Sequence, residues 1–371
     1  MQAEELIKHI ENWAPPGVAW NEDNVGIQVG SGKSKISNIF LTLELDEKSL
    51  RQAIKNKCNF IFTHHPFIFR PLKKIETSND TKSKLIAELI KNDITLYSAH
   101  TNLDFTRGGV SFELARTLGL KNISFLENSS DDQYKLVVFV PSESVEKVAV
   151  SIFASGAGEI GDYSKCSFKL EGNGTFWGNT LSNPAVGKKN KLETVPEIRL
   201  EILVPKWNLN KAISALVKTH PYEEPAYDVY PVKNKNSNYG FGAIGDLEIP
   251  MNTKNFLAHV CKSLKTNNLR YCSGKNNLIK RIAVCGGSGA ELLSNAIGKN
   301  ADAFVTADIK YHPFQDAENK ILFIDAGHYE TEIHSLNAVK QKIKKIIAES
   351  GDSINIFKYT GSTNPVKFFN K

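Results

Sequence analysis

Apolar, strand-like runs and amphipathic, helix-like segments alternate through residues 1–125, and this alternation constrains the fold more than any other feature. They follow one another in the order 38–45, 46–57, 59–63, 80–93 and 94–100. Asp46 is placed to cap the first of the helices. Strands separated by helices of this length are typical of right-handed βαβ units. The pattern therefore predicts a largely parallel sheet covered by helices on both faces.

Residues 130–235 follow a different pattern, in which one strand–helix unit occurs twice. Both predicted strands end in Val-Pro and precede a predicted helix, at 134–141 with 144–156 and at 197–205 with 209–220. The segment between the units, 171–191, is rich in Gly, Asn and Lys and is typical of loops or a hairpin. Two such units predict a small α+β domain with an antiparallel sheet.

The α/β pattern returns after this segment. A strand with a glycine loop, a helix, two further strands and a long helix are predicted at 281–289, 290–300, 301–306, 319–332 and 332–350. The chain is therefore predicted to be an α/β protein. Two related α/β lobes, residues 1–127 and 238–371, form one domain, and residues 128–237 form an inserted α+β domain.

The two outer lobes share a weak internal symmetry. In each, an apolar strand ends in Thr and polar residues, as in FIFTHHP and AFVTADIKYHP. A second strand ends in a histidine, as in LYSAHTNLD and LFIDAGHYETE. A carboxylate follows four residues later, Asp104 after His100 and Glu332 after His328. Two resemblances in the same order indicate duplicated half-domains that face each other.

Two adjacent histidines, His64 and His65, directly follow the strand at 59–63. Successive side chains of an extended segment point to opposite faces, so one packed core could accommodate at most one of these rings. Ligands of open α/β sheets bind outside the carboxyl ends of the strands. Asp104, His328 and Glu332 also lie just past such ends. Imidazole and carboxylate groups together suit zinc, manganese, iron or a related divalent ion.

A two-ion centre is one interpretation of these residues. Adjacent histidines that diverge from one backbone can serve different ions, and a carboxylate can bridge both ions. Such a centre stabilises attacking and leaving oxygens together. Each residue also has a structural interpretation: Glu332 can favour a helix N-terminus, Asp104 can lead into a helix, and a histidine can simply terminate a strand. The convergence of five ligand-type residues from two lobes favours the metal site.

Three further motifs allow two interpretations each. The segment 285–293, CGGSGAELL, can cradle a phosphate or form a tight turn between a strand and a helix. The segment 306–313, TADIKYHP, places Tyr311 and His312 near the same crevice, where they could transfer protons or be structural. The segment 219–231, THPYEEPAYDVYP, is interpreted as a rigid turn packed on an edge strand, with a ligand-binding loop as the alternative.

The composition argues against several other classes of protein. The formal charge is +6, from 46 basic and 40 acidic residues, and its even spread argues against a nucleic-acid-binding surface. The five cysteines are odd in number and include no CxxC pair, so neither a disulfide framework nor a thiolate zinc site is expected. No apolar run approaches the length of a membrane span. A cytoplasmic enzyme or regulator is expected.

The motifs DNVGIQVG, FTHHPFIFRPLK, YSAHTNLD, CGGSG, DIKYH and DAGHYETE closely resemble those of the Nif-three family of dinuclear-metal proteins. The resemblance spans both outer lobes. It implies that two divalent ions per chain are held by His64, His65, Asp104, His328 and Glu332. It also implies that residues 128–237 are similar to the PII/CutA type of domain, with HPYEEPAYDVYP as the signature. Family members form toroidal hexamers, so a homohexamer is implied.

Members of this family are named homologues of GTP cyclohydrolase 1 type 2. The name implies a hydrolytic opening of the GTP imidazole ring with release of formate, for which His100 and His312 are candidate proton carriers. Nothing in the sequence identifies a guanine-specific pocket. The leading prediction is therefore a dinuclear-metal hydrolase that acts on a nucleotide or a similar phosphorylated small molecule. The alternatives are a non-catalytic metal-binding regulator or scaffold with a sensor insert, and a metal-dependent phosphatase or phosphodiesterase.

Overall fold

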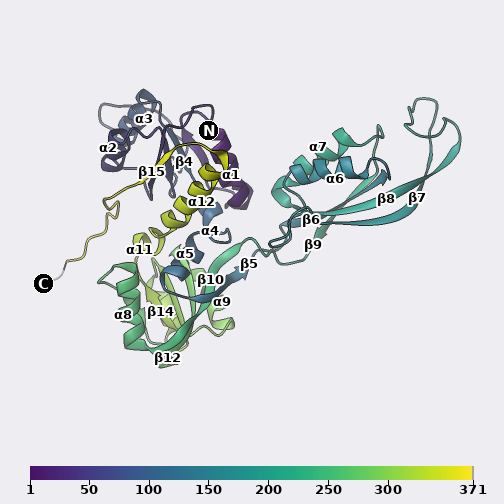
Figure 1. The fold of residues 1–371 in the computed structure, drawn as a ribbon. Coiled ribbons are helices and arrows are strands. Elements are labelled where there is room, and N and C mark those ends of the chain that lie inside the picture. Colours follow the sequence, from purple (N-terminus) through teal and green to yellow (C-terminus); the bar gives the residue numbers. More distant parts are fainter. Residues whose placement is uncertain (370–371) are drawn as a thin grey trace. The chain divides into compact units, whose positions relative to one another are not determined.

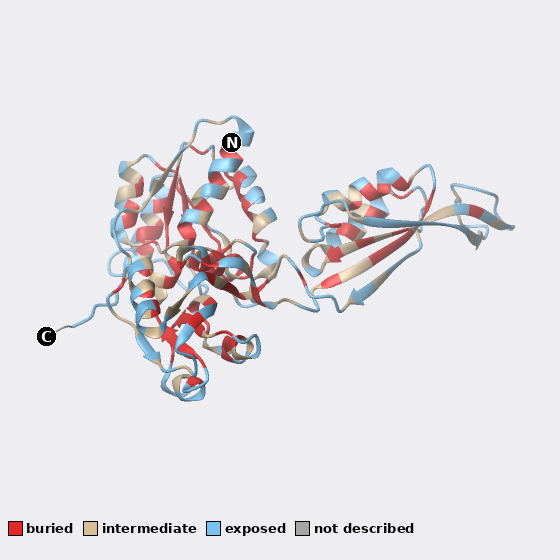
Figure 2. Ribbon diagram, turned by 60° about the horizontal axis from the view of Figure 1, so that its bottom comes forward, coloured by how far each residue is buried: buried red, intermediate tan, exposed pale blue. Residues whose placement is uncertain are grey.

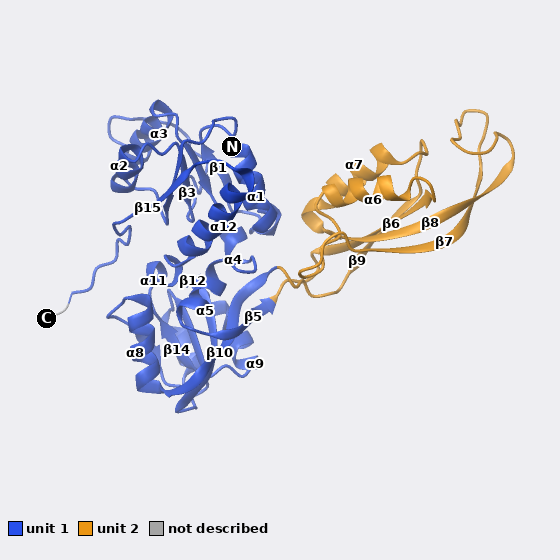
Figure 3. Cartoon of the chain, viewed as in Figure 1, with its two compact units in different colours: residues 1–127, 239–371 blue, residues 128–238 orange. Residues whose placement is uncertain are grey.

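The computed structural model describes residues 1–369, and the chain divides into two compact units (Figure 3). One unit consists of Met1–Glu127 with Tyr239–Lys371, and the other of Asn128–Asn238. Figure 2 shows that the buried residues gather along the strands and on the sheet-facing sides of the helices. The larger unit therefore combines two segments that are far apart in the sequence.

The first sheet of the larger unit has five strands in the order β1–β4–β3–β2–β15. Its strands β4 and β15 are labelled in Figure 1. The strands are β1 (Gly26–Val29), β2 (Asn38–Thr42), β3 (Phe60–Thr63), β4 (Thr95–Ser98) and β15 (Asn355–Lys358). β15, β2, β3 and β4 pair in parallel, and β1 is antiparallel to β4. The largely parallel sheet predicted from the alternation is confirmed, whereas the sequence patterns do not predict β15.

The second sheet of this unit has six strands in the order β11–β14–β13–β12–β10–β5. The strands are β5 (Lys121–Asn128), β10 (Gly240–Asn252), β11 (Arg270–Cys272), β12 (Leu278–Ser288), β13 (Ala303–Ala307) and β14 (Leu322–Asp325). β12, β13 and β14 pair in parallel, β11 is antiparallel to β14, and β10 is antiparallel to β12. Both sheets thus contain a run of parallel strands next to an antiparallel edge strand, four parallel strands in the first sheet and three in the second. The relation between the two lobes stays a prediction.

Helices cover both faces of each sheet. They are α1 (Ala3–Trp13), α2 (Glu47–Lys55), α3 (Thr81–Lys91), α4 (Thr101–Asp104), α5 (Val110–Thr117), α8 (Thr253–Leu264), α9 (Leu293–Gly298), α10 (Tyr311–Ala317), α11 (His328–Glu332) and α12 (Ser335–Ser350). On the first sheet, α1 and α12 share a core on one face, and α2 and α3 share a core on the other. On the second sheet, α5 and α8 cover one face, and α9 and α10 cover the other.

Local sequence explains where the helices begin. At α2 the Asp46 side chain accepts a hydrogen bond from the Ser49 N–H at 2.7 Å, and the Ser49 hydroxyl accepts one from the Asp46 N–H at 2.9 Å. A cap of this kind stabilises a helix by about 1 kcal/mol. The predicted capping role of Asp46 is confirmed. The part of the chain that the structure describes contains no helix long and apolar enough to cross a membrane.

The smaller unit is a four-stranded sheet with two helices. Its strands lie in the order β7–β8–β6–β9, and the three neighbouring pairs are antiparallel. The elements are β6 (Gln133–Pro141), α6 (Val145–Ala154), β7 (Ser167–Trp177), β8 (Leu192–Pro205), α7 (Leu209–Thr219) and β9 (Tyr227–Val232). Both helices share one core with the sheet. The antiparallel α+β arrangement is confirmed, and the PII/CutA likeness of this unit stays a prediction.

Candidate metal centre

The five predicted ligands come together at the carboxyl ends of strands from both sheets. His64 and His65 directly follow β3 in the first sheet, and Asp104 ends the short helix α4 that follows β4. His328 and Glu332 are the first and last residues of α11, which follows β14 in the second sheet. Helices α5 and α11 contact β12 and each other. The short helices thus bring the strand ends of the two lobes to one place.

The tandem histidines lie in a bend that follows β3 rather than on the strand itself. Strand β3 ends at Thr63, and the N–H groups of His64 and His65 both donate to the carbonyl oxygen of Leu43, at 3.1 and 3.0 Å. The chain therefore turns at this point, and the extended alternation no longer applies. The two rings lie 4.9 Å apart between centroids. Both face Glu332, although only His64 is fully buried.

Four histidines of the site have their Nδ1 atoms held by oxygen atoms. These pairs are His64 with Ala99 O at 2.9 Å, His65 with Glu44 Oε1 at 2.9 Å, His100 with Asp23 Oδ1 at 3.0 Å, and His328 with Asp308 Oδ2 at 2.6 Å. An oxygen acceptor at Nδ1 fixes the proton there and leaves Nε2 available as a ligand atom. Metal-binding histidines are oriented in this way in most proteins. The arrangement is what a metal site requires.

Asp308 adopts a backbone conformation that is rare outside glycine. It follows β13 directly and has a φ of +55°. Asp tolerates the left-handed region better than most residues, but the conformation still costs of order 1 kcal/mol. The strained residue is the one whose carboxylate holds Nδ1 of His328. Strain of this kind is often found where a side chain has been placed for function.

The Glu332 carboxylate lies at the centre of the cluster. Its Oε2 is 3.0 Å from Nε2 of His65, and its Oε1 is 3.1 Å from Nε2 of His328. Nε2 of His64 lies further away, 3.9 Å from Oε1. The residue is only 3% exposed, so its two oxygens are available to the cluster rather than to solvent. One carboxylate thus connects histidines from both lobes.

His64 and Asp104 face each other without a hydrogen bond. Because Nδ1 of His64 donates to the Ala99 carbonyl, and burial lowers the pKa of this ring to about 3, Nε2 carries a lone pair. That atom is 3.5 Å from Oδ1 of Asp104. Neither atom has a hydrogen-bond partner among residues 1–369. A proton on Asp104, whose pKa is raised, would satisfy both buried groups, and a cation bound between them would do the same.

The charged state of the remaining ligands follows from their neighbours. Burial lowers the pKa of His65, but the contacts and charges of Glu332 and Glu44 outweigh it and raise the pKa to about 10. The hydrogen bond to Glu332 raises the pKa of His328 to about 9, against the effect of burial. Burial and then the Glu332 charge raise the pKa of Asp104. A metal-free site therefore carries protons that a metal ion would displace.

The ligand atoms form two overlapping groups that could each hold a metal ion. One group contains His64, His65 and His100, and the other contains His65, His328 and Glu332. Within each group the ligand atoms lie within 4.8 Å of one another. His65 belongs to both groups. His100, a predicted proton carrier, thus lies among the candidate ligands. Its ring centroid is 5.3 Å from that of His64 and 5.5 Å from that of His65.

Gly286 and Gly287, near the end of β12, lie against this cluster. A side chain at Gly287, which has a φ of +62°, would collide with Oε1 of Glu332 and approach the His328 ring. The N–H groups of Gly286 and Gly287 donate to the hydroxyls of Ser111 and Thr331 at 3.3 and 3.0 Å. These two donors are therefore not free for a phosphate. The observations favour the tight-turn interpretation of this segment.

A cavity of about 360 Å³ opens beside the cluster. His100, Asp104, His328 and Glu332 form part of its wall, and Trp20, Phe105 and Phe241 supply aromatic rings. The ring centroids of Trp20 and Phe105 are 5.5 Å apart, and those of Phe105 and Phe241 are 4.6 Å apart. No Lys or Arg is among the described residues that line the cavity. An aromatic wall next to polar ligand groups is typical of a small-molecule site.

His312 lies on the exposed side of α10, where its Nδ1 is 3.2 Å from Oε1 of Gln315. It is not among the residues that line this cavity, and its role as a proton carrier stays a prediction. The sequence reasoning does not identify Glu44 and Asp23, which orient His65 and His100. Glu44 lies just after β2, between Leu43 and Leu45. An acidic residue within an apolar run is the feature by which the sequence could have identified it.

A family model described as Duf34/NIF3 (NGG1p interacting factor 3) matches residues 1–365. A protein of Halalkalibacterium halodurans named GTP cyclohydrolase 1 type 2 homolog is 36% identical over 365 residues, which are 98% of this chain and 98% of that protein. A protein of Bacillus subtilis with the same name is 36% identical over 370 residues, 99% of each chain. The similarity therefore extends over both units.

Solved structures agree with this similarity. A Bacillus cereus protein related to NIF3 has a TM-score of 0.83 at 35% identity and covers 100% of this chain and 99% of that chain. The Staphylococcus aureus protein SA1388 has a TM-score of 0.78 at 28% identity, with the same coverage. Both sheets and the inserted unit thus have counterparts in proteins of known structure.

Proposed function

The chain belongs to the Duf34/NIF3 family, and from this premise we propose that it is a dinuclear-metal hydrolase acting on a nucleotide or a similar phosphorylated small molecule. One observation carries the proposal: the lone pair of His64 Nε2 faces the unpartnered Oδ1 of Asp104 at 3.5 Å inside a cluster of oriented histidines. A bound cation would satisfy both groups in place of a proton on Asp104. Neutral imidazole and carboxylate ligands suit zinc, manganese or iron.

The chain's own residues divide into two sets of ligands. We assign His64 and Asp104 to one ion and His65 and His328 to the other, with Glu332 shared, because Glu332 is the carboxylate that contacts histidines of both lobes. Two divalent ions, when bound, supply positive charge for developing oxyanions and lower the pKa of water. The Nδ1 contacts of the histidines hold these ligands in place before any ion arrives.

His100 is the residue that we assign to proton transfer. Its Nδ1 is 3.0 Å from both carboxylate oxygens of Asp23, which also accepts from the N–H of Thr101 at 3.1 Å. Burial works against the ionised form of Asp23, but its hydrogen bonds to His100 and Thr101 lower its pKa to about 2. A carboxylate that stays ionised holds the imidazole ring in one orientation. His100 lines the cavity beside the metal ligands.

The cavity supports a planar ring as part of the substrate. Trp20, Phe105 and Phe241 offer ring faces and edges with which an aromatic heterocycle can stack. The described lining residues include no Lys or Arg, so positive charge for phosphate groups must come from the bound ions. This feature favours metal-dependent binding of a phosphorylated substrate over binding by the protein alone. GTP, with formate release, is the substrate that the names of the relatives suggest.

A turnover assay with a matched variant tests the proposal. We expect the protein loaded with manganese, zinc or iron to convert GTP or another nucleotide, and His65→Ala with Glu332→Ala to abolish conversion. The control is His9→Ala with Glu4→Ala, which removes the same two side-chain types from exposed positions of α1. Formate release and pterin-type fluorescence indicate ring opening, whereas phosphate release alone indicates a phosphatase or phosphodiesterase. Unchanged turnover in the His65/Glu332 double variant would refute the assigned chemistry.

A second candidate is a non-catalytic regulator or scaffold that binds metal and uses the inserted unit as a sensor. The observation that favours it is the separate core of residues 128–238. A loaded protein that holds its ions but converts no nucleotide in the screen would support it. The homohexamer is a further part of the proposal, and light scattering of the full chain measures it.

A further inference from the structure

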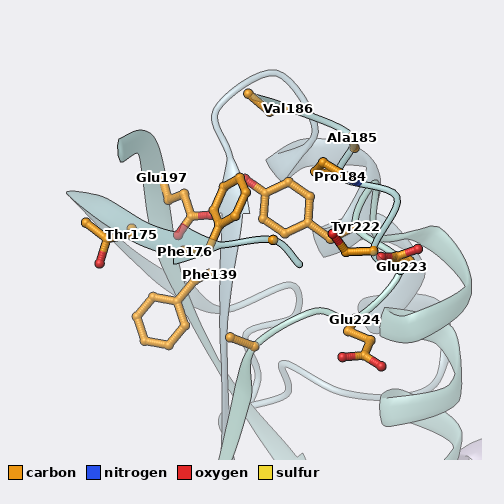
Figure 4. Close-up of a pocket in the computed structure, with 14 residues that line it drawn as sticks. Phe139, Thr175, Phe176, Pro184, Ala185, Val186, Glu197, Tyr222, Glu223 and Glu224 are labelled. Carbon is orange, nitrogen blue, oxygen red and sulfur yellow. The ribbon is translucent and has the colours of Figure 1, made fainter. Parts of the chain in front are cut away.

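The inserted unit contains a cavity that the proposed function does not use. It has a volume of about 220 Å³ and lies between β7, β8 and the turn at 219–231 (Figure 4). Phe139, Phe176 and Tyr222 line it with aromatic rings, and Glu197 lines it with a carboxylate. The Phe176 and Tyr222 rings are 6.3 Å apart at an angle of 56°. Figure 4 shows Phe176, Tyr222 and Glu197 among the residues that line the cavity.

The charge of the cavity wall is entirely negative. Glu223 and Glu224 join Glu197 among the lining residues, and no Lys, Arg or His is found among the described residues that line it. Glu223 is already engaged, because its Oε1 accepts from the Asn183 N–H at 2.7 Å. Glu223 and Glu224 are exposed, whereas Glu197 is half-buried. Glu197 is therefore the acid that a ligand inside the cavity would meet.

Glu197 has no cationic partner within the described part of the chain. Arg199, two residues further along β8, pairs with Glu201, with Nε 2.9 Å from Oε1. His220 is neutral, because its Nδ1 accepts from the Tyr222 N–H at 3.1 Å and its Nε2 donates to the Phe139 carbonyl at 3.0 Å. The two nearby bases thus leave the carboxylate uncompensated. A half-buried carboxylate in this state favours a bound cation.

Two further features indicate a site for a ligand. The hydroxyl of Tyr222 is buried and lies next to the Glu197 carboxylate. Burial, and then a side-chain hydrogen bond to Glu197, raise the pKa of Tyr222, so the hydroxyl stays protonated. A side chain at Gly174 would collide with the Glu197 carboxylate. The absence of a side chain at this position is what gives the carboxylate its place.

We propose that this cavity binds a small organic ammonium ion, with Glu197 opposite the charge, the Phe176 and Tyr222 rings around the alkyl groups, and the Tyr222 hydroxyl as a hydrogen-bond partner. Aromatic faces attract organic cations, and the attraction is strongest when water is excluded. A metal ion fits less well, because hard cations require six or more oxygen ligands. The segment 219–231, which supplies Tyr222, is then a ligand-binding turn as well as a rigid one. This inference does not depend on the metal centre.

Choline and its uncharged analogue 3,3-dimethylbutan-1-ol test the proposal, because they share a shape and differ in charge. Calorimetric titration of the full chain should show saturable choline binding below about 10 mM and much weaker binding of the alcohol. Glu197→Gln and Phe176→Leu should each weaken choline binding about tenfold or more. Glu171→Gln, at an exposed position of β7, is the charge-matched control and should leave binding unchanged.

Gly174→Ala gives a second test that alters no charge. It displaces the Glu197 carboxylate, which is the end of a flexible side chain, so the fold should tolerate it. We expect it to weaken choline binding as Glu197→Gln does, with an unchanged thermal unfolding midpoint. Equal binding of choline and the alcohol would overturn the proposal in favour of a purely apolar cavity. Absence of choline binding, or unaltered binding in Glu197→Gln, would also overturn it.

Discussion

Replacing Glu44 tests whether the oxygen atoms that contact the histidine Nδ1 atoms orient the ligands of the candidate metal centre. Glu44 accepts from Nδ1 of His65 at 2.9 Å, and its other oxygen accepts from the Thr363 hydroxyl. Glu44→Gln keeps an acceptor oxygen but removes the charge, and the side chain is 34% exposed, so solvent screens part of that charge. We expect metal affinity to fall about tenfold in Glu44→Gln and about 100-fold in Glu44→Ala, which also releases the ring.

The free-energy changes that correspond to these losses are about 1.4 and 2.7 kcal/mol. Competition between the protein and a chromogenic chelator for zinc or manganese measures them at fixed pH. The matched control is Glu47→Gln, which removes a charge from an exposed position of α2 that pairs with Arg51. If Glu44→Ala binds metal as tightly as the wild type, the Nδ1 contacts do not orient the ligands and the reasoning is refuted.

Three further predictions concern the same centre. Because the pKa values of His65 and His328 are about 10 and about 9, both rings are protonated at pH 7 without metal. Acid therefore weakens metal binding, and the apparent metal affinity should rise by up to about 100-fold per pH unit toward pH 9. Calorimetric titration in buffers of different ionisation enthalpy detects the protons that metal binding releases. A metal affinity that does not depend on pH would contradict the assignment. Gly287→Ala should abolish metal binding and lower the free energy of unfolding by about 1–3 kcal/mol. Gly351→Ala is the control and should cost less stability, because Gly351 also has a positive φ but has open space around it. Equal losses of stability in the two variants would mean that the contact with Glu332 does not matter. His100→Ala should keep its ions, measured by elemental analysis, and lose turnover; loss of an ion would make His100 a ligand instead.

The sequence predicts much of this site because parallel strands bring their carboxyl ends to one edge. His64, Asp104 and His328 each follow an apolar run, and the rule for open sheets places such residues together. The repeat of a histidine with a carboxylate four residues later points to the relation between the lobes. The similar order of β4–β3–β2 and β14–β13–β12 is the physical basis of that repeat.

Other parts of the site depend on contacts that no local pattern records. The N–H groups of His64 and His65 both donate to one carbonyl oxygen, that of Leu43, so these residues lie outside the alternation of the strand. Asp23 reaches His100 from a segment 77 residues earlier in the chain. In the inserted unit, the turn that contains Tyr222 borders a cavity only because Gly174 and Glu197 lie on neighbouring strands. These arrangements result from tertiary packing rather than from spacing.

We propose that histidines and carboxylates from both ends of the chain hold two cations around Glu332. Crystals of the metal-loaded protein, measured on both sides of the absorption edge of the metal, test it most directly. We predict two anomalous peaks per chain, one next to His64 and Asp104 and one next to His65 and His328, with the Glu332 carboxylate contacting both. A map that shows no peak within ligand distance of Glu332 would contradict the account.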